Sequence, residues 1–147
     1  MASITQCDHM KYWNELEGSK LFNMIFSKNI PIGELELFSI NIENDQPKLV
    51  FSFDIPELPD SPPTKWGKSF NRCRLGLYCL SIKDLSIKNL PYQGRFFIEI
   101  KFLEEIFTVS LSNIKDSSPN IYFKSKYLSL SGPSVYLNES SFQEAYN

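Results

Sequence analysis

The sequence predicts an α+β fold that is mostly β, with one twisted antiparallel sheet of about six or seven strands and an N-terminal helix packed on it. Aromatic residues make up 14% of the 147 residues, with twelve Phe and seven Tyr, a bias that favours sheet over helix. Only one substantial segment, near the N-terminus, has apolar residues at helical spacing. Most of the remainder alternates between apolar and polar residues in short runs separated by turn residues, which is typical of consecutive strands.

The length of the chain fits a single domain with one sizeable core. We expect residues 1–147 to form one domain in which residues 1–9 and 134–147 are loosely ordered tails. No stretch approaches the ~20 apolar residues that a membrane-spanning helix needs, and the N-terminus lacks the pattern of a signal peptide. The sequence therefore predicts a cytoplasmic protein.

The helical segment covers residues 10–28 and is predicted in two pieces, because Gly18-Ser19 interrupts the pattern. Ser19 is a good N-cap residue for the second piece, and Trp13 is expected to anchor the entry turn in the core. Four apolar residues then recur at helical spacing and form a stripe that faces the sheet: Leu21, Phe22, Ile25 and Phe26.

After residue 33 the periodicity changes from helical to alternating. Residues 34–44 and 48–55 are predicted to form a hairpin around the turn at 44–47, with a bulge between Leu37 and Phe38 where the apolar set changes phase. The further predicted strands are residues 72–80, 82–87, 96–103, 107–111 and 121 to about 130, with a tight reversal at Glu104-Glu105. Gly132-Pro133 is expected to end the last strand.

A proline-rich segment, residues 53–66, holds four of the nine prolines and one of the two tryptophans. We define this segment as the proline loop. Proline fixes φ and removes a backbone donor, so the segment is predicted to be a rigid, exposed connection, and rigid loops on sheets often carry binding sites. Trp66 follows Lys65, and this pair is either an interface anchor or a tryptophan folded back over the sheet edge.

Charge is distributed unevenly along the chain, although the net charge is only −2. Residues 1–60 carry ten acidic and four basic side chains, a balance of −6, whereas residues 61–147 carry seven acidic and eleven basic ones, a balance of +4. Such a pattern is typical of a solvated face, but an acidic surface also steers a basic partner. The candidate acidic contacts are Glu34, Glu36, Glu43, Asp45, Asp54, Glu57 and Asp60.

The residues that usually carry catalysis or hold metals are scarce. His9 is the only histidine and lies near a terminus, and the cysteines at 7, 73 and 79 follow no metal spacing. The carboxylates of the proline loop lack the further oxygen ligands and the glycine turn of a calcium loop, and no glycine-rich phosphate loop follows a strand. The sequence therefore predicts no catalytic residue, no metal site and no cofactor.

Nucleic-acid binding is also disfavoured. Four basic residues, Lys65, Lys68, Arg72 and Arg74, lie near aromatic residues in the sequence, which is the composition of a surface for single-stranded nucleic acid. However, the pI of about 5.4 is far below that of a typical nucleic-acid-binding domain.

An ordered set of short motifs resembles the Immunity protein 50 family of bacterial polymorphic-toxin systems over about residues 12–112. The motifs are Trp13-Asn14, the strand end Phe53 to Pro56, the prolines from Pro59 to Pro63, Lys65-Trp66, Phe70-Asn71 and Leu85 to Ile87. The resemblance implies a cytosolic immunity protein that binds and blocks a cognate toxin domain, without catalysis. Residues after 112 lie outside the resemblance.

The residues leave a second class of function open. A non-catalytic adaptor could present the extended Pro62-Pro63 segment to an aromatic-lined groove of several partners. An adaptor would bind these partners weakly, whereas an immunity protein would bind one partner tightly. The sequence does not decide the oligomeric state, although an open sheet edge could pair two copies.

Overall fold

The computed structural model describes residues 8–91, 94–114 and 117–138. Within these ranges the chain forms nine strands, one short α-helix and two 3-10 helices. The strands make one antiparallel sheet in the order β5-β8-β7-β6-β2-β3-β4-β9, with β1 beside β6. The predicted fold class is confirmed, and the sheet has more strands than the six or seven expected.

The strands have the following bounds: β1 Asp8–His9, β2 Glu34–Glu43, β3 Lys48–Ile55, β4 Arg72–Leu80, β5 Lys83–Ile87, β6 Arg95–Leu103, β7 Ile106–Ser112, β8 Ile121–Ser125 and β9 Tyr127–Tyr136. The helical elements are η2 at Trp13–Glu15, α1 at Lys20–Ile25 and η3 at Thr64–Trp66. Among the described residues, no helix is long and apolar enough to span a membrane.

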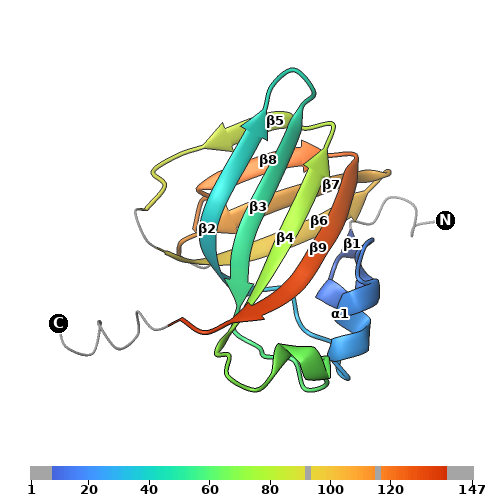
Figure 1. The fold of residues 1–147 in the computed structure, drawn as a ribbon. Coiled ribbons are helices and arrows are strands. Elements are labelled where there is room, and N and C mark those ends of the chain that lie inside the picture. Colours follow the sequence, from blue (N-terminus) through green and yellow to red (C-terminus); the bar gives the residue numbers. More distant parts are fainter. Residues whose placement is uncertain (1–7, 92–93, 115–116, 139–147) are drawn as a thin grey trace.

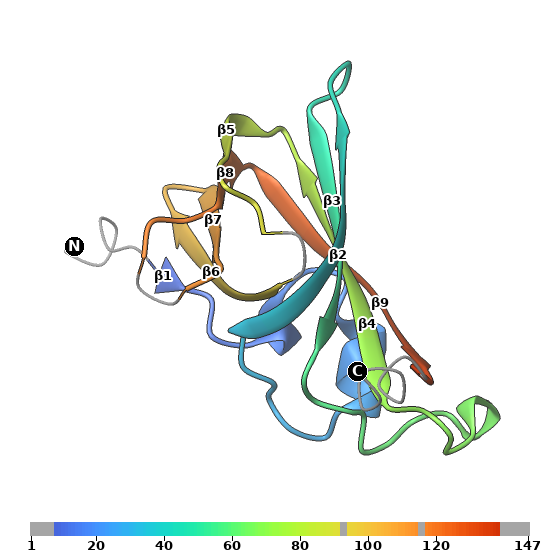
Figure 2. The ribbon, with the colours of Figure 1, turned by 90° about the vertical axis from the view of Figure 1, so that its left-hand side faces the viewer.

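The sheet bends back over itself, so that its two halves become facing layers (Figures 1 and 2). One layer contains β2, β3, β4 and β9, and the other contains β5, β8, β7 and β6. Phe51 of β3 and Phe123 of β8 are not on neighbouring strands, yet their ring centroids lie 5.7 Å apart. The apolar sides of both layers therefore share one core, and α1 lies at one end of it (Figure 1).

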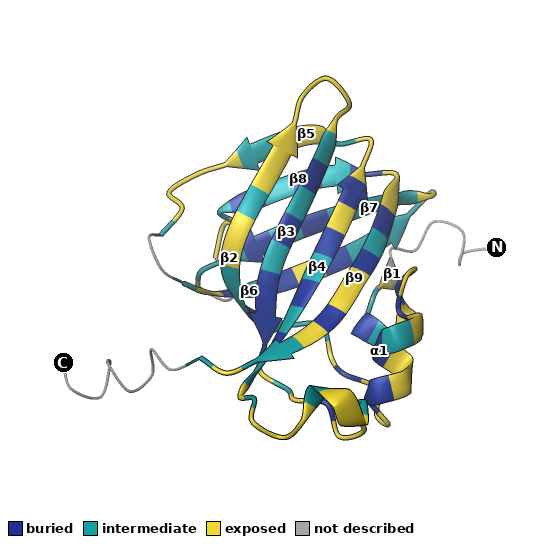
Figure 3. Cartoon of the chain, in the orientation of Figure 1, coloured by how far each residue is buried: buried dark blue, intermediate teal, exposed yellow. Residues whose placement is uncertain are grey.

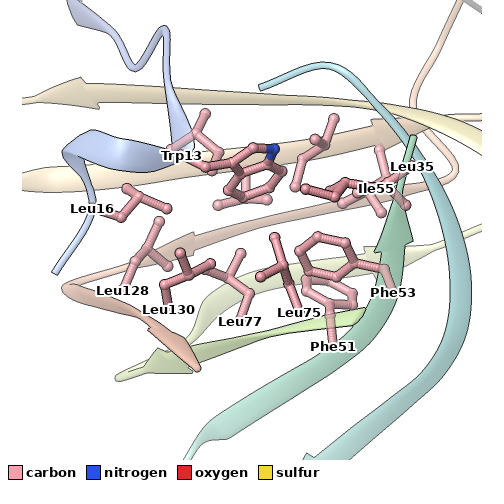
Figure 4. Packing of buried hydrophobic residues seen from close by; sticks show 14 of the residues in the cluster. Trp13, Leu16, Leu35, Phe51, Phe53, Ile55, Leu75, Leu77, Leu128 and Leu130 are labelled. Carbon is pink, nitrogen blue, oxygen red and sulfur yellow. The ribbon is translucent and has the colours of Figure 1, made fainter. Parts of the chain in front are cut away.

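Trp13 is the largest side chain in this core and is fully buried. Its ring centroid lies 5.2 Å from that of Phe53, and Figure 4 shows it surrounded by leucine, isoleucine and phenylalanine side chains. Because burying one Leu or Phe side chain stabilises a fold by about 1.5–3 kcal/mol, this cluster holds the N-terminal segment firmly against both layers. The predicted role of Trp13 is confirmed.

The helical segment is divided in two, as predicted, but its helical residues, Trp13–Glu15 and Lys20–Ile25, cover only part of the predicted range 10–28. Gly18 separates η2 from α1 and has φ +79°, and a Cβ atom at this position would lie 2.3 Å from the carbonyl oxygen of Leu130. Glycine is therefore required here. Ser19 precedes α1 at the N-cap position, but its hydroxyl donates to the carbonyl of Asn14 (2.9 Å) instead of capping the helix. The predicted capping hydrogen bond is wrong.

The hairpin of β2 and β3 and the reversal after β6 form as predicted. The register of β2 against β3 shifts between Leu37 and Ser39, which is the expected bulge. Glu104 and Glu105 both have positive φ, at 50° and 64°, which is the geometry that a two-residue hairpin turn requires.

The C-terminal strand prediction is wrong. Residues 121–136 form two strands that are separated only by Lys126, and β9 continues through Gly132-Pro133 to Tyr136. Proline is tolerated there because β9 is an edge strand and the register shifts beside it. Residues 134–136 thus belong to the sheet, not to a tail.

The N-terminal tail prediction is corrected in part. Residues Asp8–His9 form β1 and pair with β6, because β6 extends beyond the three residues of β2 with which it pairs and leaves its edge open there. Residues 1–7 and 139–147 of the predicted tails lie outside the described residues.

Candidate partner-binding surface

The layer of β2, β3, β4 and β9 has one side that no described helix or strand crosses. In Figure 3 the four strands are seen from this side, and α1 lies to the side of β9. Residues that are directly opposite in an antiparallel sheet share a face. We define the outer face as the side chains that this register places away from the core, together with Phe38 of the bulge: Glu36, Ser39, Asn41, Glu43, Lys48, Val50, Ser52, Asp54, Arg72, Arg74, Gly76, Tyr78, Leu80, Tyr127, Ser129, Ser131, Ser134 and Tyr136.

Asp54 and Arg74 form an ion pair at one end of the outer face. Arg74 Nε donates to Asp54 Oδ1 at 3.0 Å, and the hydroxyl of Tyr136 donates to Asp54 Oδ2. Arg74 Nη2 in turn donates to the Tyr136 hydroxyl at 2.8 Å. The Asp54 side chain is only 2% exposed, so its charge is compensated inside the protein and is not available to a partner. Asp54 is therefore removed from the predicted acidic surface.

The guanidinium of Arg74 also contacts two aromatic rings. Its Cζ atom lies 3.9 Å from the ring centroid of Phe38 and 4.8 Å from that of Tyr136. The bulge after Leu37 turns Phe38 to the outside, where it remains 45% exposed. Tyr136 keeps its proton, because burial and the hydrogen bond to Asp54 raise the pKa of its hydroxyl to about 12. We define Phe38, Arg74 and Tyr136 as the arginine cluster.

Two further ion pairs lie beside the arginine cluster. Arg72 Nη1 lies 2.7 Å from Glu36 Oε2, and this hydrogen bond raises the pKa of Arg72. Arg95 of β6 lies 3.5 Å from Glu34, and the Arg95 side chain is more exposed than that of Arg72. Glu34 thus meets a basic partner on the neighbouring strand β6, and Glu36 meets one on β4, across β3, which cancels their charge locally.

A second exposed group lies at the opposite end of the outer face. Tyr78, Leu80 and Tyr127 are 41%, 38% and 43% exposed. Lys48 lies 5.5 Å from the centroid of the Tyr78 ring and 3.3 Å from Glu43. We define Tyr78, Leu80 and Tyr127 as the tyrosine cluster. It lies roughly 13 Å from the arginine cluster along β4, since Arg74 and Tyr78 are four residues apart.

The floor between the two clusters consists of small side chains. The register places Ser52 of β3 opposite Gly76 of β4, and Gly76 opposite Ser131 of β9. A Cβ at Gly76 would lie 3.3 Å from the Cβ of Ser131. The outer face therefore has two aromatic ends and a low, flat centre.

The acidic residues that the sequence singled out do not form one surface. Glu34 and Glu36 lie at the start of β2, whereas Glu43 and Asp45 lie at the hairpin turn, about 23 Å from Glu36 at 3.3 Å per residue. Within the described residues, Glu34, Glu36, Glu43 and Asp54 each pair with an arginine or lysine. Strand pairing brings arginines from the second half of the sequence beside Glu34, Glu36 and Asp54, so the predicted acidic contacts lie in separate groups, and their role in binding stays a prediction.

The proline loop, which includes η3, is tied to the end of α1 instead of extending freely. Asp60 accepts hydrogen bonds from the backbone and the hydroxyl of Ser27, which lower its pKa, and the Ser61 amide donates to Ile25. Trp66 is partly buried and packs against the core, whereas Lys65 is exposed. The structural interpretation of Trp66 is confirmed.

Glu57 differs from the other carboxylates of the proline loop. Its Oε1 atom is buried and has no hydrogen-bond partner among the described residues. Burial, and to a smaller extent the charge of Glu34, raise the pKa of Glu57. Asp54 and Asp60 have separate partners, in Arg74 and Ser27, so the three carboxylates do not converge.

The described histidine and cysteines lie as predicted. His9 is 54% exposed and lies 3.6 Å from Glu99. Cys73 and Cys79 are fully buried and free, and burial raises the pKa of both thiols. Cys7 is outside the described residues.

Sequence reasoning did not identify the aromatic members of the outer face as a surface. Tyr78 was noted only as part of a strand, between the buried residues Leu77 and Cys79. The available signal was the phase of the alternation: Tyr78 occupies a position where a solvated strand normally carries a polar residue. Phe38 has no such signal, because the bulge changes the phase at that residue.

Comparison with known proteins supports the resemblance seen in the motifs. The model of the Immunity protein 50 family matches residues 18–136. The match includes β8 and β9, which the motifs did not reach. No curated protein and no solved structure matches the chain. The match covers most of the sequence, and the chain therefore belongs to the Immunity protein 50 family.

Proposed function

We propose that this protein is a cytoplasmic bacterial immunity protein that binds one cognate protein toxin and neutralises it by contact, without catalysis. Membership of the Immunity protein 50 family supports this function. The outer face, with the arginine cluster at one end and the tyrosine cluster at the other, is the binding surface that we propose.

The observation that carries this proposal is the composition of the outer face. Tyrosine, arginine and phenylalanine are enriched in protein interfaces, and tyrosine and arginine often dominate the binding energy. Both clusters expose such residues on a sheet side that no described element covers. A face that only meets water would carry charged or small polar residues at these positions.

The arginine cluster is held in place before any partner binds. Arg74 contacts Asp54, Tyr136 and Phe38 at the same time. Binding therefore costs little additional side-chain entropy at this point. Since an immunity protein has to hold its toxin tightly, this rigidity suits the proposed function.

Electrostatic steering is a secondary part of the proposal. Glu34, Glu36 and Glu43 are paired with basic side chains, so we place them at the rim with Asp45, where they add little net charge to the contact. Rim charges affect association rate and salt dependence more than affinity. We therefore expect affinity to fall only modestly as the salt concentration rises.

The adaptor function is less well supported. Pro62 and Pro63 are half-buried, and the loop is bonded to the α1 region at Asp60 and Ser61. An aromatic-lined groove needs both sides of an extended proline segment to be accessible. Glu57, Asp60, Lys65 and Trp66 remain as a possible contact region only for a partner that approaches this end of the molecule.

The first test is to capture the toxin and then to map its contact. A tagged copy of the protein is used to retrieve partners from the source organism, and mass spectrometry identifies the retained proteins. We expect one stoichiometric partner with a toxin domain. Several weak partners, or none when the toxin is known to be expressed, would contradict the proposed function.

The contact is mapped by calorimetry with the captured toxin domain. Phe38→Ala and Tyr127→Ala each remove an exposed aromatic ring from one end of the outer face, and we expect each to weaken binding at least about tenfold, or 1.4 kcal/mol. Met24→Ala is the matched control, because Met24 is 68% exposed on α1. Unchanged affinity for both outer-face variants would show that the toxin binds elsewhere.

A further inference from the structure

One edge of β2 is open over more than half of the strand. β2 pairs with β3 along most of its length, but with β6 only at Glu34, Leu35 and Glu36. Along residues 38–43 no described strand pairs with β2 on the side away from β3. Figure 2 shows that this half of the hairpin rises beyond the neighbouring strands. An open edge presents unpaired backbone groups that can pair with another strand.

The two outermost strands of the sheet are protected in ways that proteins commonly use. β9 contains Gly132-Pro133 and a register shift, and its Leu130 amide is bonded to the carbonyl of Glu17. β5 has five residues, irregular register and an exposed charged pair, Lys83-Asp84. Short edges, bulges, prolines and charges all prevent unwanted pairing.

The open edge of β2 lacks most of these features. Its segment reads Phe-Ser-Ile-Asn-Ile-Glu, and beyond the bulge it contains neither lysine nor proline. Ile42 is 50% exposed although it lies opposite the buried Leu49, on the core side of the layer. A groove of about 140 Å³ separates Ile42 from Ile82 and Leu85, so the core is incomplete beside this edge.

We propose that this edge pairs with the same edge of a second copy of the chain, so that two β2 strands join antiparallel about a two-fold axis at Asn41. This register places Ile40 of one copy opposite Ile42 of the other, on the core side. Asn41 then lies opposite Asn41, and Ser39 opposite Glu43. Apolar residues meet apolar residues and no like charges are opposed, as a self-complementary two-fold interface requires.

The pairing also improves the burial of the exposed apolar residues at this edge. Ile42 gains a neighbour on its open side, and the apolar side chains of the second copy cover the groove. Five paired residues per copy, Ser39 to Glu43, make an interface at the small end of the range for specific complexes, below about 1,200 Å². The dimer is therefore weak, with a dissociation constant in the micromolar range.

This dimer does not depend on the proposed function, since it uses the strand edge and leaves the outer face free. Toxin binding and self-association are therefore tested by different variants. Loss of the dimer would leave the outer face intact, and loss of toxin binding through Tyr127→Ala would leave the β2 edge intact.

Sedimentation velocity of the purified full chain tests the proposal. We expect the mass to rise from 17.0 kDa toward twice that value as the concentration increases from about 1 μM to several hundred μM, the range of weak interfaces. Ile42→Lys introduces the charge that protected edges carry and should keep the protein monomeric. Ile114→Lys is the matched control, because Ile114 is 65% exposed and lies outside the β2 edge.

A cross-linking variant tests the register and does not depend on the loss of a contact. Asn41→Cys places one thiol opposite its copy across the two-fold axis, within reach of a disulfide. Under mild oxidation we expect a covalent dimer from Asn41→Cys and none from Ile114→Cys. A protein that stays monomeric at all concentrations, or a dimer that survives Ile42→Lys and does not cross-link at position 41, would overturn the proposal.

Discussion

The proline loop and the outer face contain the same kinds of residue but use them differently. The loop carries acidic, basic and aromatic side chains, and several of them are used for internal attachment: Asp60 bonds to Ser27, and Trp66 packs on the core. The outer face also combines a carboxylate, arginines and aromatic rings. On the outer face, the ion pair of Asp54 with Arg74 instead holds neighbouring side chains in exposed positions.

The difference shows that rigidity and accessibility are separate properties. A proline-rich segment is rigid because of its own covalent structure, but the fold decides which of its side chains remain free. The outer face becomes rigid only through contacts between strands that are far apart in sequence, such as Asp54 with Tyr136. Its exposed rings are therefore a consequence of the sheet register.

The largest expected effect comes from breaking the ion pair under the arginine cluster. Arg74→Met removes the cation beside Asp54 and leaves a carboxylate that is 2% exposed. An unpaired buried charge costs about 3–5 kcal/mol, so we expect the free energy of unfolding to fall by about 3 kcal/mol in urea denaturation.

The matched control is Arg95→Met, which removes the exposed pair with Glu34. Exposed pairs contribute about 0–1 kcal/mol, so this variant should remain close to the native stability. Equal losses of unfolding free energy in the two variants would mean that the ion pair of Asp54 and Arg74 contributes no more to stability than an exposed pair.

A smaller effect is expected from removing one hydroxyl group of the arginine cluster. Tyr136→Phe deletes the donor to Asp54 and the acceptor for Arg74, and a hydrogen bond to a charged group contributes about 1.5–3 kcal/mol. Tyr78→Phe removes a hydroxyl from an exposed ring and should change stability by less than about 0.5 kcal/mol. Indistinguishable unfolding midpoints would show that the Tyr136 hydroxyl adds nothing to the cluster.

The smallest effect concerns Glu57, the carboxylate of the proline loop that has a buried oxygen without a hydrogen-bond partner among the described residues. The pKa of Glu57 is raised in the folded protein, so ionisation at neutral pH opposes folding, and stability is lost as pH rises through the folded-state pKa. Glu57→Gln should therefore be more stable than the native protein at pH 7 by a few tenths of a kcal/mol, about the size expected at a partly exposed site.

The advantage of Glu57→Gln should disappear as the pH falls below the ordinary value of 4.5, because the native carboxyl is then neutral in both states. Urea midpoints at several pH values measure this difference. A stability difference that does not change with pH would contradict burial as the cause.

Local features of the fold were predictable from the sequence, and pairing features were not. Gly18, the bulge before Ser39 and the turn at Glu104-Glu105 depend on short-range geometry, and each was found where the pattern placed it. The corner at Lys126 has no glycine or proline to mark it. It is fixed instead by a distant contact, in which the Ser125 hydroxyl donates to the carbonyl of Leu80.

The arrangement of the candidate acidic contacts was not predictable from the sequence for the same reason. The balance of −6 in the first sixty residues is a property of sequence order, whereas charge on the surface depends on which strands are neighbours. Glu36 meets Arg72, and Asp54 meets Arg74, only because β2, β3 and β4 lie side by side. A single sequence does not show that order.

The attachment of the N-terminal segment to the last strand affects when the protein can fold during synthesis. The Leu130 amide bonds to the carbonyl of Glu17, and β9 lies beside β4. Contacts between such distant segments form slowly and late. The core around Trp13 therefore closes only after β9 has left the ribosome, so a chain that is still being synthesised and lacks β9 also lacks its complete core.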